Sequence, residues 1–125
     1  MIVAGVGARP GTAAAELAAA VTAALAEAGV DPAAVTVLAT LDRRAAEPGL
    51  RSYARHTGRR LVAFPAARLA GQPVPGRSAV VAAATGTPSV AEAAALLAAG
   101  PAARLILPKR ILGRVTVALA GTAPG

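Results

Sequence analysis

The sequence contains no cysteine and only two aromatic residues, Tyr53 and Phe64. The absence of cysteine excludes disulfide bonds, thiolate zinc sites and cysteine nucleophiles. Two aromatic rings are too few for the stacking platforms that bind single-stranded nucleic acid. No apolar run reaches the roughly 18 residues of a membrane-spanning helix, and the N-terminus lacks the basic region of a signal peptide. We therefore expect a cytoplasmic protein that does not associate with membranes.

Acidic residues are also scarce, with 6 Asp and Glu against 13 Lys and Arg, for a net charge of +7. This balance favours an anionic partner, which could be nucleic acid, an anionic membrane surface or a small molecule with several carboxylates. A GC-rich genome would also produce it, because nearly all the basic residues are arginine and the chain is rich in Ala, Gly and Pro. Charge alone does not choose between these explanations.

Short apolar segments alternate with helical patterns along the 125 residues. We expect strands over residues 2–6, 35–39, 61–64, 78–83, 105–107 and 115–120. Helices are expected over residues 13–28, 49–57 and 90–99, with a short helical turn at 65–71, an irregular segment at 40–48 and a hairpin connection at 109–114. Thr12 is the expected N-cap of the first helix, Gly29 and Gly58 are expected to end the first two helices, and Ser89 with Glu92 forms a capping box.

This alternation predicts a three-layer α/β/α fold. Its sheet would be mostly parallel, with five to six strands and an antiparallel C-terminal strand. We expect residues 1–125 to form one domain.

Three segments follow the expected strands at their carboxyl ends: residues 5–12, 40–47 and 85–92. Ligands of open α/β sheets bind along that edge. Carboxylates are bound by backbone N–H groups at helix N-termini and by guanidinium forks. A glycine loop at Gly5 and Gly7 would supply the first, and Arg9, Arg43 and Arg44 the second. Alternatively, the glycines only make a tight turn and the arginines are solvated.

The acidic residues near this edge are open to two interpretations. Asp42 and Glu47 could act as a general base, or they could form local ion pairs that shape a loop. Glu92 could take part in chemistry or only in the capping box. Lys109, the only lysine, could contact a carboxylate or lie exposed in a turn. His56 is the only histidine and no metal-ligand spacing surrounds it, so we expect no metal and no cofactor.

Three stretches of the sequence follow a recognisable pattern. The first is Gly5-Val6-Gly7-Ala8-Arg9-Pro10-Gly11-Thr12, and the second runs from Leu38-Ala39-Thr40 through Glu47 to Leu50. The third begins at Gly86-Thr87-Pro88-Ser89 and continues into Leu105-Ile106-Leu107-Pro108-Lys109 and residues 115–120. Together these stretches resemble the CobE/CbiG C-terminal-domain family of cobalamin (vitamin B12) biosynthesis. The family usually has lysine where this chain has Arg44, and arginine could not replace a lysine that donates a proton or acts as an amine nucleophile.

The resemblance implies that the partner is a precorrin-type tetrapyrrole, with or without cobalt, and that other corrin-pathway enzymes are further partners. Two-domain members of the family open a lactone and release a two-carbon fragment, so a cobalt-precorrin-5A hydrolase-like activity is one option. The stand-alone form, to which this chain is similar, implies binding or transfer of an intermediate instead. From the sequence itself we expect a monomer or homodimer that does not bind nucleic acid. The expected catalytic residues are Asp42, Glu47 and Glu92, of which Asp42 or Glu47 could instead bind a pyrrole N–H. The expected substrate-binding residues are Gly5, Gly7, Arg9, Thr12, Thr40, Arg43, Arg44, Gly86 and Lys109.

A small dinucleotide-binding α/β domain is the alternative. It is suggested by a glycine loop after the first strand and by Asp42 after the second, where a ribose-binding acid could lie. The glycines, however, are spaced G-x-G-x-x-x-G and not G-x-G-x-x-G.

Overall fold

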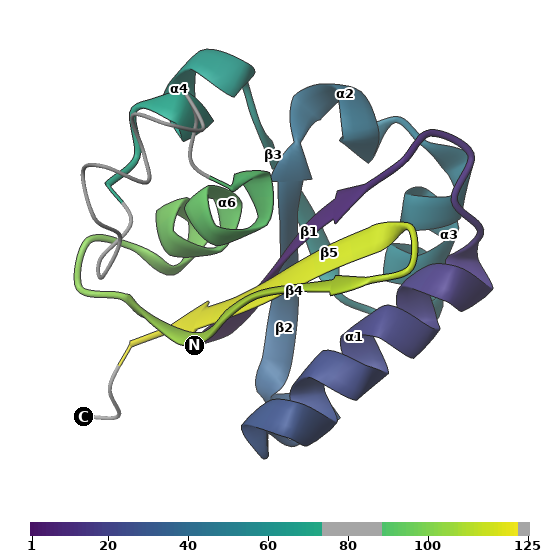
Figure 1. Ribbon diagram of the computed structural model, residues 1–125, viewed down its shortest axis with the longest axis horizontal. Coiled ribbons are helices and arrows are strands. Elements are labelled where there is room, and N and C mark those ends of the chain that lie inside the picture. Colours follow the sequence, from purple (N-terminus) through teal and green to yellow (C-terminus); the bar gives the residue numbers. More distant parts are fainter. Residues whose placement is uncertain (74–88, 123–125) are drawn as a thin grey trace.

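A computed structural model describes residues 1–73 and 89–122 (Figure 1). The strand predicted over residues 78–83 and the predicted site residue Gly86 lie outside the described residues.

The described strands form one five-stranded sheet in the order β3-β2-β1-β5-β4. They are β1 (Ile2–Ala8), β2 (Val35–Leu41), β3 (Arg60–Phe64), β4 (Arg104–Leu112) and β5 (Val115–Gly121). The first three are parallel neighbours, whereas β5 runs antiparallel to both β1 and β4. This arrangement confirms the predicted α/β fold with an antiparallel C-terminal strand. The predicted connection over residues 109–114 is too long, because β4 continues to Leu112 and only Gly113 and Arg114 make the turn.

Helices cover both faces of the sheet (Figure 1). On one face, α1 (Ala14–Ala28) and α3 (Pro48–Thr57) bury a large apolar cluster that includes Leu17, Val21 and Leu38. On the other face, α6 (Val90–Ala99) packs against β1 and β2, and α4 (Ala66–Ala70) packs beside α6. The helix η1 (Pro32–Ala34) precedes β2. None of the described helices is both long enough and apolar enough to cross a membrane.

The helix ends follow local chemistry in most cases. Gly29 and Gly58 end α1 and α3 with φ angles of 69° and 71°, the left-handed conformation that glycine adopts most readily. The Ser89 side chain accepts a hydrogen bond from the Glu92 N–H, as predicted. The predicted Thr12 cap is wrong, because the N-cap of α1 is Ala13.

Gly5 lies in the middle of β1, directly beneath α6. A Cβ atom at this position would come within 1.9 Å of the Ala91 carbonyl oxygen. Only a residue without a side chain lets the helix backbone approach the strand this closely. The predicted tight loop at Gly5 and Gly7 is therefore wrong, because β1 extends through both glycines to Ala8 and pairs with β5 along its whole length.

Candidate ligand-binding site

Three segments meet at the edge where the parallel strands end. They are the loop over residues 9–13 after β1, the short helix α2 (Asp42–Ala45) after β2, and the tip of the β4–β5 hairpin. The irregular segment predicted at residues 40–48 is wrong in its detail, because Thr40 and Leu41 complete β2 and a helical turn follows at once. Two hollows lie at this edge: an inner cavity below the surface and an outer depression that is open to it.

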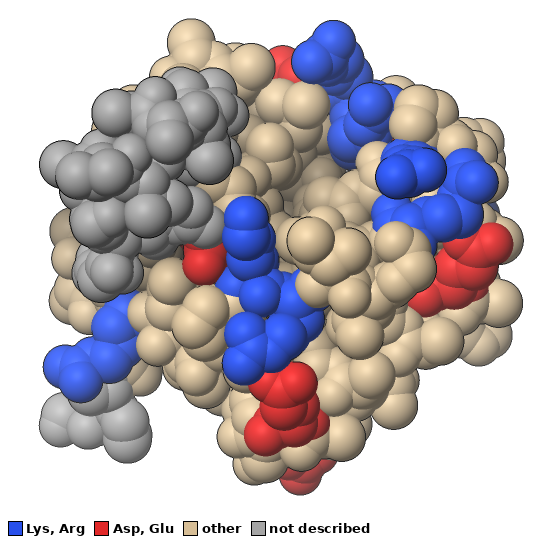
Figure 2. Space-filling model, in the orientation of Figure 1, with Lys and Arg blue, Asp and Glu red and all other residues tan. Residues whose placement is uncertain are grey.

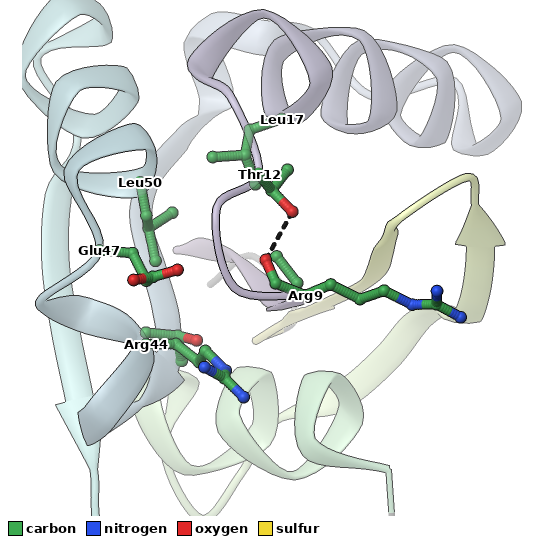
Figure 3. A pocket seen from close by; sticks show the side chains of 8 residues that line it. Arg9, Thr12, Leu17, Arg44, Glu47 and Leu50 are labelled. Carbon is green, nitrogen blue, oxygen red and sulfur yellow. Dashed lines mark hydrogen bonds between the residues drawn. The ribbon is translucent and has the colours of Figure 1, made fainter.

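The inner cavity measures about 10 Å³, which is room for roughly one water molecule. It is lined by Ala8, Arg9, Thr12, Leu17, Thr40, Arg44, Glu47 and Leu50 (Figure 3). A macrocyclic ligand could not enter a space of this size.

Polar side chains around the inner cavity hold its walls together. The buried Thr40 hydroxyl donates to the Val6 carbonyl at 2.7 Å and thereby extends the contact between β2 and β1. The buried Thr12 hydroxyl donates to the Arg9 carbonyl at 2.6 Å (Figure 3). The Glu47 carboxylate accepts from the Gly11 N–H at 2.7 Å, so it fixes the loop after β1. The structure therefore gives these three predicted site residues a supporting role.

The outer depression measures about 370 Å³ and opens to the surface. Its lining consists of Gly7, Ala8, Arg9, Pro10, Arg44, Ile111, Gly113, Arg114 and Thr116. Three of these residues are arginines and none is acidic. The space-filling view shows a hollow on this face with Lys and Arg side chains around its rim (Figure 2).

The three arginines reach the depression from three different segments. Arg44 is half-buried on α2, and the exposed Arg9 extends away from the inner cavity toward the hairpin (Figure 3). Arg114 donates from Nη2 to the Pro10 carbonyl at 2.8 Å, and its Nε lies 3.7 Å from Glu16 Oε2. Within the described part of the chain, neither Arg9 nor Arg44 forms an ion pair. Both guanidinium groups are thus available to an anionic ligand.

The remaining predicted residues that the structure describes do not line either hollow. Asp42 and Arg43 are exposed on α2, and Gly5 is covered by α6. Glu92 is only 3% exposed on α6, and its Oε2 accepts from the Lys109 backbone N–H at 3.1 Å. This contact is long-range, and the capping motif did not predict it.

Arg114 and Ile111 were not predicted as site residues. Both lie within two positions of the turn at Gly113, and Ile111 pairs with Thr116 across the hairpin. A signal was present, because a glycine between two apolar segments is typical of a hairpin. The tip of that hairpin has to lie at the carboxyl end of β4, which is the edge where open α/β sheets commonly bind ligands.

The dinucleotide alternative requires a glycine loop that cradles phosphates before a helix. Gly5 and Gly7 lie within β1, so the structure contradicts this arrangement. In the described residues, no three His, Asp or Glu side chains are grouped so that they could hold a metal ion.

An open α/β sheet with an arginine-lined, acid-free depression at its carboxyl edge is typical of proteins that bind a small anionic ligand. Comparison of the sequence with protein families identifies the family. The chain belongs to the family of the cobalamin synthesis G C-terminus, whose model matches residues 2–120. The predicted family membership is confirmed.

Individual relatives support membership of the same family. The chain is 40% identical over 124 residues to the protein CobE of a Sinorhizobium species, covering 98% of this chain and 80% of that protein. The crystal structure of cobalamin biosynthesis protein chiG from Agrobacterium tumefaciens is 38% identical, with a TM-score of 0.81 and coverage of 99% and 100% of the two chains. The crystal structure of CobE, a protein from the cobalamin biosynthetic pathway, is 38% identical, with a TM-score of 0.79 and coverage of 96% and 89%.

Proposed function

We propose that this protein acts in cobalamin biosynthesis by binding a precorrin-type tetrapyrrole through the carboxylate arms of its ring. The observation that carries the proposal is the outer depression with Arg9, Arg44 and Arg114 on its lining and no acidic residue. Family membership supports the pathway, and the depression supports the chemistry of the ligand.

Precorrins carry acetate and propionate side chains around an apolar ring. Guanidinium groups bind carboxylates with two parallel hydrogen bonds, which fixes orientation as well as adding affinity. A depression of about 370 Å³ is at the small end of the range for ligand sites, so the ring would lie across it and insert only its arms. The available guanidinium groups of Arg9 and Arg44 suit that pose.

The same lining favours binding or transfer of an intermediate over lactone opening. None of the residues that line the outer depression is a general acid or base at neutral pH. Glu47 lines only the inner cavity, where its carboxylate accepts from the Gly11 N–H. Arginine, unlike lysine, serves neither as a proton donor nor as an amine nucleophile, so Arg44 is suited to binding a carboxylate.

Titration with cobyrinic acid, a corrin with free acetate and propionate arms, tests the proposal. Binding would be followed by the visible absorption of the corrin and by calorimetry. Cobinamide, a corrin whose arms are amidated, is the matched control, and NADH and duplex DNA are further controls. We expect saturable binding of cobyrinic acid and at least about tenfold weaker binding of cobinamide. Absence of cobyrinic acid binding, or equal affinity for both corrins, would overturn the proposal.

A further inference from the structure

Ile111 is the most exposed large hydrophobic residue of the described chain, with 72% of its side chain accessible. Single exposed apolar residues are common on protein surfaces and by themselves mean little. Ile111, however, lines the outer depression beside Arg114. A β-branched apolar side chain and a guanidinium group therefore share one wall of the site.

The two residues come from the tip of the β4–β5 hairpin, which is held in place. Ile111 pairs with Thr116 and Leu112 with Val115 across the hairpin. The tip is tied to the loop after β1, because the Arg9 N–H donates to the Arg114 carbonyl at 3.2 Å and Arg114 Nη2 donates to the Pro10 carbonyl at 2.8 Å. A wall fixed in this way needs little ordering when a ligand arrives.

The chemistry of this wall fits an amphipathic anion. A small polar polyanion would use the arginines and leave Ile111 in water. A ligand with an apolar ring and carboxylate arms would use both, because the ring buries Ile111 while an arm reaches Arg114. The space-filling view shows Lys and Arg side chains at the rim of the hollow and uncharged residues on its floor, which leaves the floor for the apolar part of the ligand (Figure 2).

We propose that the hairpin tip recognises the ring itself, with Ile111 packing on one face of the macrocycle and Arg114 pairing a carboxylate beside it. This inference rests on the proposed function and adds that affinity depends on an apolar contact as well as on charge.

The test compares Ile111→Ser with Ile106→Ser. Both isoleucines lie on β4, but Ile106 is 39% exposed and does not line the depression. Cobyrinic acid affinity should fall at least about fivefold in Ile111→Ser and less than about twofold in Ile106→Ser. Ile111→Ala is a second variant at the same position, and thermal unfolding of all three variants checks that the fold is retained.

The outcomes separate the two proposals. If the unsubstituted protein binds cobyrinic acid and both Ile111 variants bind it equally well, the hairpin does not contact the ring and the inference fails alone. If the unsubstituted protein does not bind cobyrinic acid, the proposed function fails and the inference fails with it. An equal loss in Ile106→Ser and Ile111→Ser would also overturn the inference, because it would reflect a change of the whole strand.

Discussion

Arg43 and Arg44 are neighbours on α2 with different surroundings. Arg44 is half-buried and lines both hollows, whereas Arg43 is exposed and lines neither. We expect Arg44→Ala to weaken cobyrinic acid binding roughly tenfold, because a charge-assisted hydrogen bond to a carboxylate is lost. Arg43→Ala should change the affinity less than about twofold, because it removes the same charge without a contact. Calorimetric titration of both variants measures the difference, and equal losses would show that net charge alone attracts the ligand.

Gly5 and Gly7 are two positions apart on β1 but differ in what lies above them. A Cβ atom at Gly5 would meet the Ala91 carbonyl oxygen at 1.9 Å, whereas at Gly7 the nearest atom is Thr116 Cβ at 3.9 Å. Gly5→Ala should therefore lower the free energy of unfolding by about 3 kcal/mol or more, since α6 has to move away from the sheet. Gly7→Ala should cost less than about 1 kcal/mol. Urea unfolding of the two variants makes the comparison, and similar stabilities would contradict the close packing of α6.

These glycines also show where local sequence misleads. A glycine pair after an apolar run is typical of a turn, and that was the prediction for Gly5 and Gly7. Both glycines are held in the strand by Thr116 and Ala118 of β5, more than 100 positions along the chain, and Gly5 also pairs with Ala39 of β2. The local sequence therefore carries no signal that β1 continues through Gly7 to Ala8.

At the scale of elements, β4 is joined to α6 by a buried carboxylate. The ladder between β4 and β5 shifts register between Leu107 and Arg110, which leaves Pro108 and Lys109 as a bulge. The Lys109 N–H donates to Glu92 Oε2 at 3.1 Å. The Glu92 side chain therefore links the bulge in β4 to α6.

Removing that carboxylate should destabilise the protein. We expect Glu92→Ala to lower the free energy of unfolding by about 2 kcal/mol or more, because the Lys109 N–H loses its charged acceptor and a buried side chain is removed. Glu27→Ala is the control, since Glu27 pairs with Arg110 of the same strand but has 48% of its side chain exposed. Its loss should cost less than about 1 kcal/mol. Chemical denaturation of both variants decides, and a Glu92→Ala protein as stable as Glu27→Ala would show that the contact contributes little.

The join between α3 and β2 depends on Tyr53 and Arg59. Arg59 Nη1 donates to the Tyr53 hydroxyl at 2.7 Å, and Arg59 Nε donates to the Val35 carbonyl at 3.1 Å. Burial raises the pKa of the Tyr53 phenol above its ordinary value of 10.0, an effect that the nearby Arg59 partly opposes. The phenol is therefore harder to ionise in the folded protein than in the unfolded chain.

The sign of the resulting pH dependence follows from linkage. Below about pH 10 the phenol is neutral in both states, and above it the unfolded chain loses its proton first, so the free energy of unfolding should fall as the pH rises. In the Tyr53→Phe variant, the free energy of unfolding should therefore fall less over this pH range than in the unsubstituted protein. Because the chain has one tyrosine and one lysine, few other groups titrate in this range. Unfolding free energies measured from about pH 8 to about pH 11 test the point, and parallel curves for the two proteins would exclude Tyr53 as the source.

At the scale of the whole molecule, the family and the order of elements could be predicted because they depend on local signals. Gly29, Gly58 and Ser89 end or begin their helices where the sequence places them. The site was predicted less well, because it is assembled from segments that meet only after folding. Arg9 and Arg44 follow strands and could be placed at the edge, but Arg114 lies in the turn between β4 and β5 and comes to this edge because β5 pairs antiparallel with β1. The role of Gly86 in binding the ligand stays a prediction.

The net charge of +7 raises the question of how far the whole surface attracts the ligand. Screening by salt weakens exposed charge pairs, so the affinity for cobyrinic acid should fall several-fold between about 0.05 M and about 0.5 M NaCl, while cobinamide binding should hardly change. Arg51→Ala with Arg55→Ala lowers the net charge on the exposed side of α3 without touching either hollow. If this double variant keeps its affinity while Arg44→Ala loses it, the salt dependence arises at the depression. An equal loss in both would mean that long-range attraction dominates, since charges distributed over the surface act together at low salt.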